Sequence, residues 1–301
     1  MSAAPPRALE AAGRRLELGD RPLLMGIVNA TPDSFSDAAG TRTLEQRVEL
    51  AASMLAAGAD VIDVGGESGV TNRPTVDPEE ETRRVVPLIE RITRELGVLV
   101  SVDTYKPAVA RAAIAAGASM VNDVSGLRDP GLADVCAQTG AGLVLMHTRA
   151  APKEKVLDPA YDGVIVDDVL AFLAARIELA QARGVAFEQI VVDPGPDFAK
   201  TPAQTVEVLR SLDRLHDLER PVLLAVSRKD FIGAITLRRP RERLAGTLAA
   251  VVHGVDAGAH ILRVHDVAQA ADYLAVRAVL DGTLELESEL RVPEELRREQ
   301  G

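Results

Sequence analysis

Polar and charged residues follow a series of short apolar runs in this chain, each at the point where a run stops. In chain order they include Asn29, Asp63, Asp103, Asn122, His147, Asp193, Lys229 and Arg263. One such residue would mean little, because Asp and Asn are common in turns. Eight in succession indicate that the carboxyl ends of several strands converge on one site, which is where parallel barrels place their chemistry.

Three of these residues suit a heterocyclic ligand. Asp103, Asn122 and Asp193 could all form hydrogen bonds with a ring that carries amino and N–H donors, such as an aminopyrimidinone. A carboxylate that accepts two such bonds at once makes the strongest form of this contact. The alternative for each residue is a buried strand cap that satisfies backbone donors.

Cationic side chains gather at the last two runs. Arg263 and His265 lie at the end of the eighth run, and Lys229 follows the seventh. Because late strands of barrels often carry phosphate sites, this group could hold a phosphate or pyrophosphate. The alternative is a cluster of salt bridges that stabilises the same end of the fold.

Eight apolar runs alternate with Ala- and Leu-rich helical patterns and would position these residues. They are 23–28, 60–64, 98–102, 119–122, 141–146, 189–192, 221–226 and 259–264. The runs are apolar throughout, as expected for parallel strands covered by helices. Eight such units predict an α/β fold, the (β/α)8 TIM barrel, in a single domain. A doubly wound sheet is the alternative, because strand count alone does not prove closure.

Local signals mark where helices begin and end. Thr43 and Gln46 have the spacing of a capping box, and Pro107 suits a first helical position. Glycines that could close helices in the left-handed conformation precede four strands, namely Gly58, Gly117, Gly140 and Gly258. The expected organisation is an N-terminal extension over 1–21, the barrel over 22–282, and a charged tail over 283–301 that is an exposed helix or a frayed end.

Composition limits the classes of function. The 301 residues are 47% hydrophobic, enough for a large aliphatic core, and carry a formal net charge of −11. That charge argues against nucleic-acid binding, which needs clustered Lys and Arg. No run approaches the ~20 apolar residues of a membrane span, and the N-terminus lacks the apolar segment of a signal peptide. Cys136 is the only cysteine, so no internal disulfide can form and a cytoplasmic location is expected.

Together the motifs closely resemble those of dihydropteroate synthases, the pterin-binding enzymes of folate biosynthesis. The resemblance covers roughly residues 22 to 282, and the motifs occur in the family's order. They are Asn29–Asp37, Gly65-Gly66-Glu67-Ser68, Ser101-Val102-Asp103-Thr104, Asn122-Asp123-Val124-Ser125-Gly126, Leu145-Met146-His147, Asp193-Pro194-Gly195, Ser227-Arg228-Lys229 and Arg263-Val264-His265-Asp266. The resemblance implies that p-aminobenzoate is joined to 6-hydroxymethyl-7,8-dihydropterin diphosphate, with release of pyrophosphate.

The resemblance also implies how the pterin and its diphosphate are held. The pterin ring would contact Asp103, Asn122, Asp193 and Lys229, with Met146 packing beside it. Asn29 would contribute to a Mg²⁺–pyrophosphate site that Arg263 and His265 complete. Mg²⁺ and the cations would stabilise the charge that develops on the departing pyrophosphate.

The acceptor end would be formed mainly by loops. Phe35 and Phe198 would shape the p-aminobenzoate pocket, and the loop that carries Asp37 would close and exclude water. Asp37 would stabilise a pterin methylene cation, although an ordinary loop cap is the equal alternative for this residue. Lys229 and Arg73 are the other residues expected to take part in catalysis.

Departures from the family pattern are concentrated at this acceptor end. Extra residues displace Thr71 and Arg73 in the second loop, and Asp230 stands where the family often has a Ser that helps to receive a carboxylate. Asp230 would repel the acceptor unless it turns away or Arg73 intervenes. Asp197-Phe198-Ala199-Lys200 replaces a frequent Gly-Phe-Gly-Lys, and Ala225 replaces a frequent Gly. The pterin and pyrophosphate end is therefore retained, whereas the acceptor end is altered.

Other functions stay open. A divergent or non-catalytic pterin-binding paralogue with altered acceptor use is one alternative. A methyltetrahydrofolate:corrinoid methyltransferase shares the pterin-binding barrel, but the Asn29–Asp37 loop and the Ser227-Arg228-Lys229 motif favour the synthase. The small-molecule substrates are the expected partners, and a homodimer through the late helices is expected as in the family.

Overall fold

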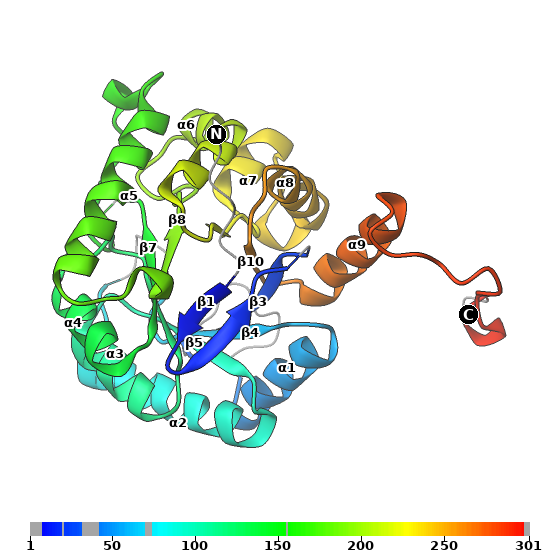
Figure 1. Cartoon of the computed structure of the whole chain (residues 1–301), viewed down its shortest axis with the longest axis horizontal. Coiled ribbons are helices and arrows are strands. Elements are labelled where there is room, and N and C mark those ends of the chain that lie inside the picture. Colours follow the sequence, from blue (N-terminus) through cyan, green and yellow to red (C-terminus); the bar gives the residue numbers. More distant parts are fainter. Residues whose placement is uncertain (1–7, 20, 32–41, 70–73, 155, 298–301) are drawn as a thin grey trace.

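The computed structural model describes residues 8–19, 21–31, 42–69, 74–154 and 156–297. A ring of parallel strands stands at its centre, and helices surround that ring (Figure 1). The strands are β3 (Leu23–Asn29), β4 (Val61–Gly65), β5 (Leu99–Asp103), β6 (Met120–Asp123), β7 (Gly142–Met146), β8 (Ile190–Asp193), β9 (Leu223–Leu224) and β10 (Ile261–Val264). Each of the eight predicted strands is present.

The strand order shows that the sheet closes. Neighbouring strands pair in parallel in the order β8-β7-β6-β5-β4-β3-β10-β9. A further parallel bridge joins Val192 to Val222, which brings the two edge strands β8 and β9 together. The prediction of a TIM barrel is confirmed, and the doubly wound alternative is not what forms.

Helices follow the strands and cover the outside of the barrel. They are α1 (Leu44–Ala56), α2 (Pro78–Leu96), α3 (Pro107–Ala115), α4 (Gly131–Thr139), α5 (Ile165–Ala182), α6 (Pro202–Arg210), α7 (Asp230–Thr236), α8 (Leu244–Asp256) and α9 (Val267–Leu280). The capping box of Thr43 and Gln46 forms as predicted, and Pro107 is the first residue of α3. The four glycines expected to close helices have positive φ, which suits their left-handed role.

Alternation along each strand separates two apolar layers. In β10, Ile261 belongs to a cluster inside the barrel, whereas Leu262 and Val264 belong to the layer between strands and helices. Each buried aliphatic side chain of this kind stabilises the fold by about 1.5–3 kcal/mol. Because the side-chain period of a strand is two residues, Arg263 must face the barrel axis with Ile261. The same alternation directs polar side chains at the strand ends into the barrel, next to the inner apolar cluster.

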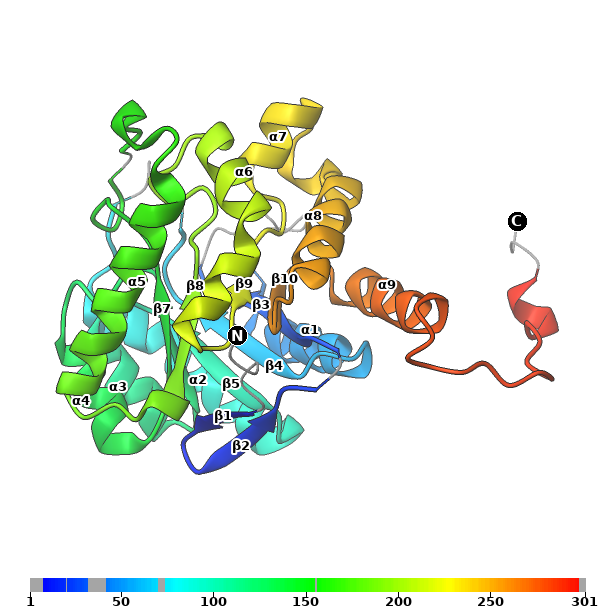
Figure 2. The same ribbon diagram turned by 45° about the horizontal axis from the view of Figure 1, so that its top comes forward.

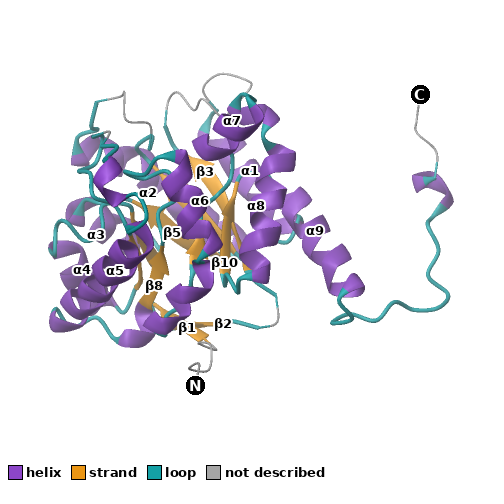
Figure 3. Ribbon diagram, turned by 90° about the horizontal axis from the view of Figure 1, so that it is seen from above, coloured by secondary structure: helices purple, strands orange, loops and turns teal. Residues whose placement is uncertain are grey.

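A hairpin that the sequence analysis did not predict closes the opposite end of the barrel. Strands β1 (Ala8–Ala11) and β2 (Arg14–Glu17) pair antiparallel within the expected N-terminal extension. Leu9, Ala11 and Leu16 are buried in the inner apolar cluster, and the Ala12 N–H donates to the Gly140 carbonyl at 2.7 Å. Figures 2 and 3 show the hairpin beneath the strands, at the end away from α7. This end is therefore plugged, and the other end is free to carry a site.

The described part of the C-terminal tail leaves the barrel. After α9 the chain extends outward over residues 283–297, exposed throughout, with one short turn of 3-10 helix at Glu294–Leu296 (Figures 1 and 3). Further 3-10 turns lie at Pro159–Tyr161, Phe187–Gln189, Leu212–Leu218 and Pro240–Glu242. Among the described residues, no helix has the length and apolar character needed to cross a membrane.

Candidate active site

Two aspartates share one arginine at the carboxyl end of the barrel. Arg263 on β10 donates from Nε to Asp63 Oδ2 and from Nη2 to Asp103 Oδ2, both at 2.6 Å. Asn122 on β6 donates from Nδ2 to the same Asp63 oxygen at 3.3 Å. Strand β10 and the three adjacent strands β4, β5 and β6 therefore contribute to one hydrogen-bonded cluster, with β3 between β10 and β4. The predicted residues Asp103, Asn122 and Arg263 meet here.

This cluster carries an excess of acceptors over donors. Burial raises the pKa of Asp103 to about 7, while the charge of Arg263 opposes that change. The two carboxylates together raise the pKa of Arg263, so the guanidinium stays charged. Among the described residues, neither Asp63 Oδ1 nor Ser101 Oγ has a hydrogen-bond partner, although both atoms are buried. A ligand with several N–H donors would satisfy such acceptors, since buried polar atoms are normally paired.

Asp193 is the last residue of β8, and Lys229 lies between β9 and α7, directly before the first residue of α7. Asp193 is buried, and its Oδ1 accepts the Gly195 N–H at 2.7 Å. Burial lowers the pKa of Lys229, whose Nζ lies 4.2 Å from the centre of the Phe198 ring. Met146, the last residue of β7, is buried. No hydrogen bond within the described residues links Asp193 or Lys229 to the arginine cluster, but all of these residues occupy the same end of the barrel.

A second group surrounds a smaller cavity beside β3. The cavity has a volume of about 120 Å³ and is lined by Ile27, Asn29, Arg42, Leu50, Met54, Arg228 and His265. His265 Nδ1 lies 3.0 Å from Ser227 Oγ, and Arg228 pairs with Asp266 at 2.6 Å. The last two sequence motifs are therefore bonded to one another.

The charge of this second group differs from what the sequence suggested. Burial, with Arg228 as the next cause, lowers the pKa of His265 to about 3, so its ring is neutral near pH 7. Arg263 does not line this cavity, because its guanidinium is held by Asp63 and Asp103. The other cationic side chains that line this cavity are Arg42 and Arg228, and Arg228 is paired with Asp266. Arg228 also has a positive φ of 60°, a strained conformation of the kind that is concentrated at functional sites.

The start of α7 explains how the chain accommodates Asp230. The Asp230 side chain is 88% exposed and pairs with Arg243 at 3.0 Å. Another acid lies against the first turn: Asp197 Oδ2 accepts the backbone N–H groups of Asp230 and Phe231, and Asp197 Oδ1 accepts from Thr205 Oγ1 at 3.1 Å. The charge of Asp230 is thus balanced by Arg243, and the carboxylate bonded to the backbone here is Asp197.

Two of the family departures have an unusual backbone. Asp197 has a φ of 65° and Ala199 a φ of 49°, both in the left-handed region. The frequent glycines of the family pattern adopt this region without strain, whereas a Cβ makes it costly by roughly 1–2 kcal/mol. Asp tolerates it better than most residues. Both positions where the family pattern often has glycine therefore have a backbone of the kind that glycine favours, and one of them carries a charged side chain.

A buried chain of polar groups supports this same loop. Lys200 Nζ lies 2.7 Å from His147 Nδ1 and donates to the Gly195 and Phe198 carbonyls at 2.9 and 3.2 Å. His147 Nε2 lies 2.9 Å from Asp168 Oδ2. Burial lowers the pKa of His147 to about 3 and that of Lys200 to about 7. The chain ties α5 and β7 to the loop that carries Phe198.

The Gly-Gly-Glu-Ser motif is fixed by a separate network. Glu67 accepts from Lys106 Nζ at 2.6 Å and from Tyr105 Oη at 3.0 Å, and it pairs with Lys153 at 3.1 Å. Lys106 also pairs with the buried Glu81. The conformation at the beginning of the second loop therefore depends on residues of three other segments.

Some predicted residues cannot be placed. Phe35, Asp37, Thr71 and Arg73 lie outside the described residues. Asp63 and His147 were predicted only as members of the strand-end group, and no role was predicted for Lys200. A charged residue inside the apolar run Val61–Val64 was the available signal for Asp63, because strand alternation directs it to the barrel axis. Lys200 gave no such signal, since its partners come from distant segments.

The fold and the site define a class of protein: a (β/α)8 enzyme that presents carboxylates, an amide and cations to a small polar ligand. The family model "Pterin binding enzyme" matches residues 25–265. Dihydropteroate synthase of Bacillus subtilis is 44% identical over 85% of this chain and 87% of that protein. The Escherichia coli enzyme of the same name is 40% identical over 89% of this chain and 94% of that protein.

Solved structures agree with these sequence relatives. The Xanthomonas albilineans dihydropteroate synthase with 4-aminobenzoic acid has a TM-score of 0.83 and 43% identity, covering 91% of this chain and 98% of that one. The Yersinia pestis enzyme in a sulfonamide complex has a TM-score of 0.85 and 38% identity, covering 92% of this chain and 100% of that one. The chain therefore belongs to the pterin-binding enzyme family and, within it, to the dihydropteroate synthases.

Proposed function

We propose that this protein joins p-aminobenzoate to 6-hydroxymethyl-7,8-dihydropterin diphosphate, with the side-chain roles that follow. The observation that carries the assignment is the cluster in which Arg263 holds Asp63 and Asp103 beside Asn122. It offers several buried acceptors to a ring rich in N–H donors. Related structures hold 4-aminobenzoic acid and 7,8-dihydropteroate, an acceptor and a product of this reaction.

The pterin ring would lie between this cluster and Lys229. Asp103 and Asp193 would accept hydrogen bonds from N–H groups along the ring edge, and the Asn122 amide would accept or donate one. Asp63 Oδ1, which has no partner among the described residues, would accept a further N–H. Met146 would form an apolar wall beside the ring. The chain holds these groups on strand ends, so little reorganisation would be needed when the ligand binds.

The diphosphate would bind at the cavity of Asn29, Arg42, Arg228 and His265. The side-chain amide oxygen of Asn29 is a ligand type that Mg²⁺ prefers. Mg²⁺ is usually held by one or two protein oxygens together with substrate phosphates. Bound there, the ion would neutralise charge on the leaving diphosphate. Among the described residues, no three His, Cys, Asp or Glu side chains are grouped so that they could hold a metal ion. Asn29 would therefore be the protein's contribution.

The reaction breaks the bond between the pterin methylene carbon and the diphosphate oxygen. The diphosphate leaves with the bonding electrons, and the amine nitrogen of p-aminobenzoate attacks the methylene cation and then loses a proton. Phe198, held near Lys229, would form part of the acceptor pocket with Phe35 and Thr71. The catalytic roles expected for Asp37 and Arg73 stay predictions, as does the cytoplasmic location.

Purified protein incubated with Mg²⁺, dihydropterin diphosphate and labelled p-aminobenzoate tests this proposal. Labelled dihydropteroate and pyrophosphate should form in equal amounts, and EDTA should stop their formation. A sulfonamide should compete with p-aminobenzoate. Pterin binding without any product would instead identify a non-catalytic paralogue, and methyl transfer to a corrinoid would identify the methyltransferase alternative.

We also propose a homodimer through the late helices. Ile235 and Leu237 on and after α7 are 68% and 89% exposed, and Val276 and Leu280 on α9 are 60% and 82% exposed. Helix α8 packs against both α7 and α9, so these side chains belong to one continuous side of the barrel. Sedimentation equilibrium should give twice the 32.0 kDa chain mass, and Leu237→Glu should shift the protein to monomer. A wild-type protein that stays monomeric at micromolar concentration would contradict the dimer.

A further inference from the structure

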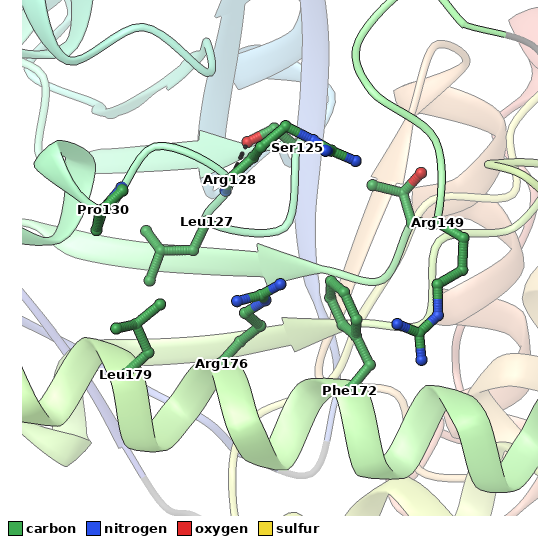
Figure 4. A pocket seen from close by; sticks show the side chains of 9 residues that line it. Ser125, Leu127, Arg128, Pro130, Arg149, Phe172, Arg176 and Leu179 are labelled. Carbon is green, nitrogen blue, oxygen red and sulfur yellow. Dashed lines mark hydrogen bonds between the residues drawn. The ribbon is translucent and has the colours of Figure 1, made fainter.

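A larger cavity lies outside the strand-end site, between the loop after β6 and helix α5. Its volume is about 350 Å³, and Figure 4 shows the side chains around it. The polar and aromatic residues that line it include Ser125, Arg128, Thr148, Arg149, Phe172 and Arg176. None of the residues of the Arg263 cluster lines this cavity. We propose that it binds a phosphate-bearing small molecule.

Three guanidinium groups give the cavity its charge. Arg128 and Arg176 have no carboxylate partner among the described residues, and the Nε of Arg176 is buried without a hydrogen-bond partner there. Arg149 is the member of the three that has a counterion, because it pairs with Asp168. Because Arg128 and Arg176 line the cavity, an acceptor ligand bound there would supply partners that these guanidinium groups lack among the described residues.

The nearest buried acid, Asp123, offsets only part of the charge of these arginines. Both oxygens of Asp123 are engaged with backbone, since they accept the N–H groups of Ser125 and Leu127. Burial lowers the pKa of Arg176, and the charges of Arg149 and Arg128 add to this effect, whereas Asp123 opposes it weakly. Three guanidinium groups, set against the carboxylates of Asp168 and Asp123, leave an excess of about one positive charge at the cavity.

Phe172 orients two of the three arginines. The guanidinium carbons of Arg176 and Arg149 lie 4.7 and 5.1 Å from the centre of its ring. Stacking on an aromatic face restricts a guanidinium and fixes the direction of its N–H donors. Gly126 allows the ring to lie close to the loop, because a Cβ at this residue would come within 2.6 Å of the ring. The site is therefore preorganised on one helix and one tightly packed loop.

The charge and geometry favour a phosphoryl group over a single carboxylate. A phosphate monoester carries nearly two negative charges at neutral pH, and its three oxygens can accept from several guanidinium groups, whereas a carboxylate offers one charge and two oxygens. The whole chain has a net charge of −11, so such a patch is not a consequence of general basicity. The volume of about 350 Å³ leaves room for more than the phosphate alone.

Calorimetric titration with inorganic phosphate measures the affinity of this site. Arg128→Gln removes an exposed guanidinium and should not disturb folding, while Arg176→Gln removes a partly buried one. Each substitution should raise the dissociation constant of phosphate at this cavity about tenfold, because hydrogen bonds to charged groups are among the stronger ones. Arg183→Gln is the matched control, because Arg183 caps the end of the same helix and pairs with Asp134 outside the cavity.

Phosphate could also bind at the strand-end cavity, so the position of the ion must be seen. Crystals soaked in phosphate should show density within hydrogen-bond distance of Arg128 and Arg176 in the wild type and none there in Arg128→Gln. Density confined to the cavity of Asn29 and His265 would overturn the proposal. Wild-type phosphate affinity in both Arg128→Gln and Arg176→Gln would overturn it as well.

Discussion

The pterin and diphosphate end of the site and its acceptor end are built on different principles. Asp63, Asp103, Asn122 and Arg263 come from strand ends, where eight paired strands fix the backbone. Phe198 and its neighbours come from a loop after β8, which is held by side chains from other segments. The first end has the composition that the family pattern implies, whereas the second has new charges.

That difference shows how a barrel can vary one substrate site and keep the other. Asp197 could replace glycine because the loop keeps its left-handed backbone and gains bonds to α7 and Thr205. Asp230 could appear because Arg243 pairs with it. A charge inside the strand-end cluster would have no comparable compensation, because every charged partner there is already shared.

The strand-end cluster should therefore be the most sensitive region. Arg263→Gln leaves Asp63 and Asp103 without a counterion, so we expect the free energy of unfolding to fall by about 3–5 kcal/mol and turnover to fall by about 10²- to 10³-fold. Denaturant unfolding and initial rates measure these effects. Arg277→Gln, which removes an exposed pair with Asp256, should cost less than about 1 kcal/mol. Equal losses in the two variants would contradict the special role of the cluster.

Lys200 tests the support of the acceptor loop. Burial lowers its pKa to about 7 from an ordinary value of 10.5, so the unfolded chain binds the Lys200 proton more tightly than the folded protein does. The contribution of this residue to the free energy of unfolding should rise with pH between those values, on the order of 1 kcal/mol per pH unit. Lys200→Met should lose this slope.

The same variant should also be less stable at pH 7, by roughly 1–3 kcal/mol, because the Gly195 and Phe198 carbonyls lose a buried donor. Urea unfolding at pH 7, 8 and 9 gives both quantities. An unchanged pH slope in Lys200→Met would show that Lys200 remains protonated in the folded protein and that its burial is offset.

The smallest effect is expected for the new charge of the acceptor loop. Asp197→Asn keeps a residue that tolerates positive φ and an oxygen that can accept from α7, and it removes a negative charge near the proposed acceptor pocket. We expect the KM for p-aminobenzoate to fall about two- to fivefold, because less repulsion acts on its carboxylate. A higher KM would mean that Asp197 helps to orient the acceptor through α7.

The sequence predicted those features that depend on local pattern. Eight apolar runs and their helix-closing glycines sufficed for the barrel, and the positions of Asp103, Asn122 and Arg263 at strand ends sufficed to bring them to one end. The hairpin of β1 and β2 was missed, although Leu9 and Ala11 alternate before a turn at Ala12 and Gly13. The hairpin covers the inner apolar cluster, and this role can be recognised only once the position of that cluster is known.

Features that depend on distant partners could not be predicted in this way. The pairing of Asp230 with Arg243 joins the start of α7 to the residue before α8, and the support of Lys200 comes from His147 and carbonyl groups. His265 was expected to be a cation, but its protonation depends on burial and on Arg228. Each outcome is set by packing between segments and has no signature in a single stretch of sequence.

The independence of the two ends can be measured directly by two-substrate initial-rate kinetics on wild type, Asp197→Asn, Asp230→Ser and the double variant. The KM for dihydropterin diphosphate should stay within about twofold of wild type in every variant, because the strand-end cluster is untouched. The KM for p-aminobenzoate should change in Asp197→Asn and much less in Asp230→Ser, whose carboxylate is exposed and paired. If the KM for dihydropterin diphosphate shifted as much as the KM for p-aminobenzoate, the result would contradict the independence of the pterin and diphosphate end from the acceptor end.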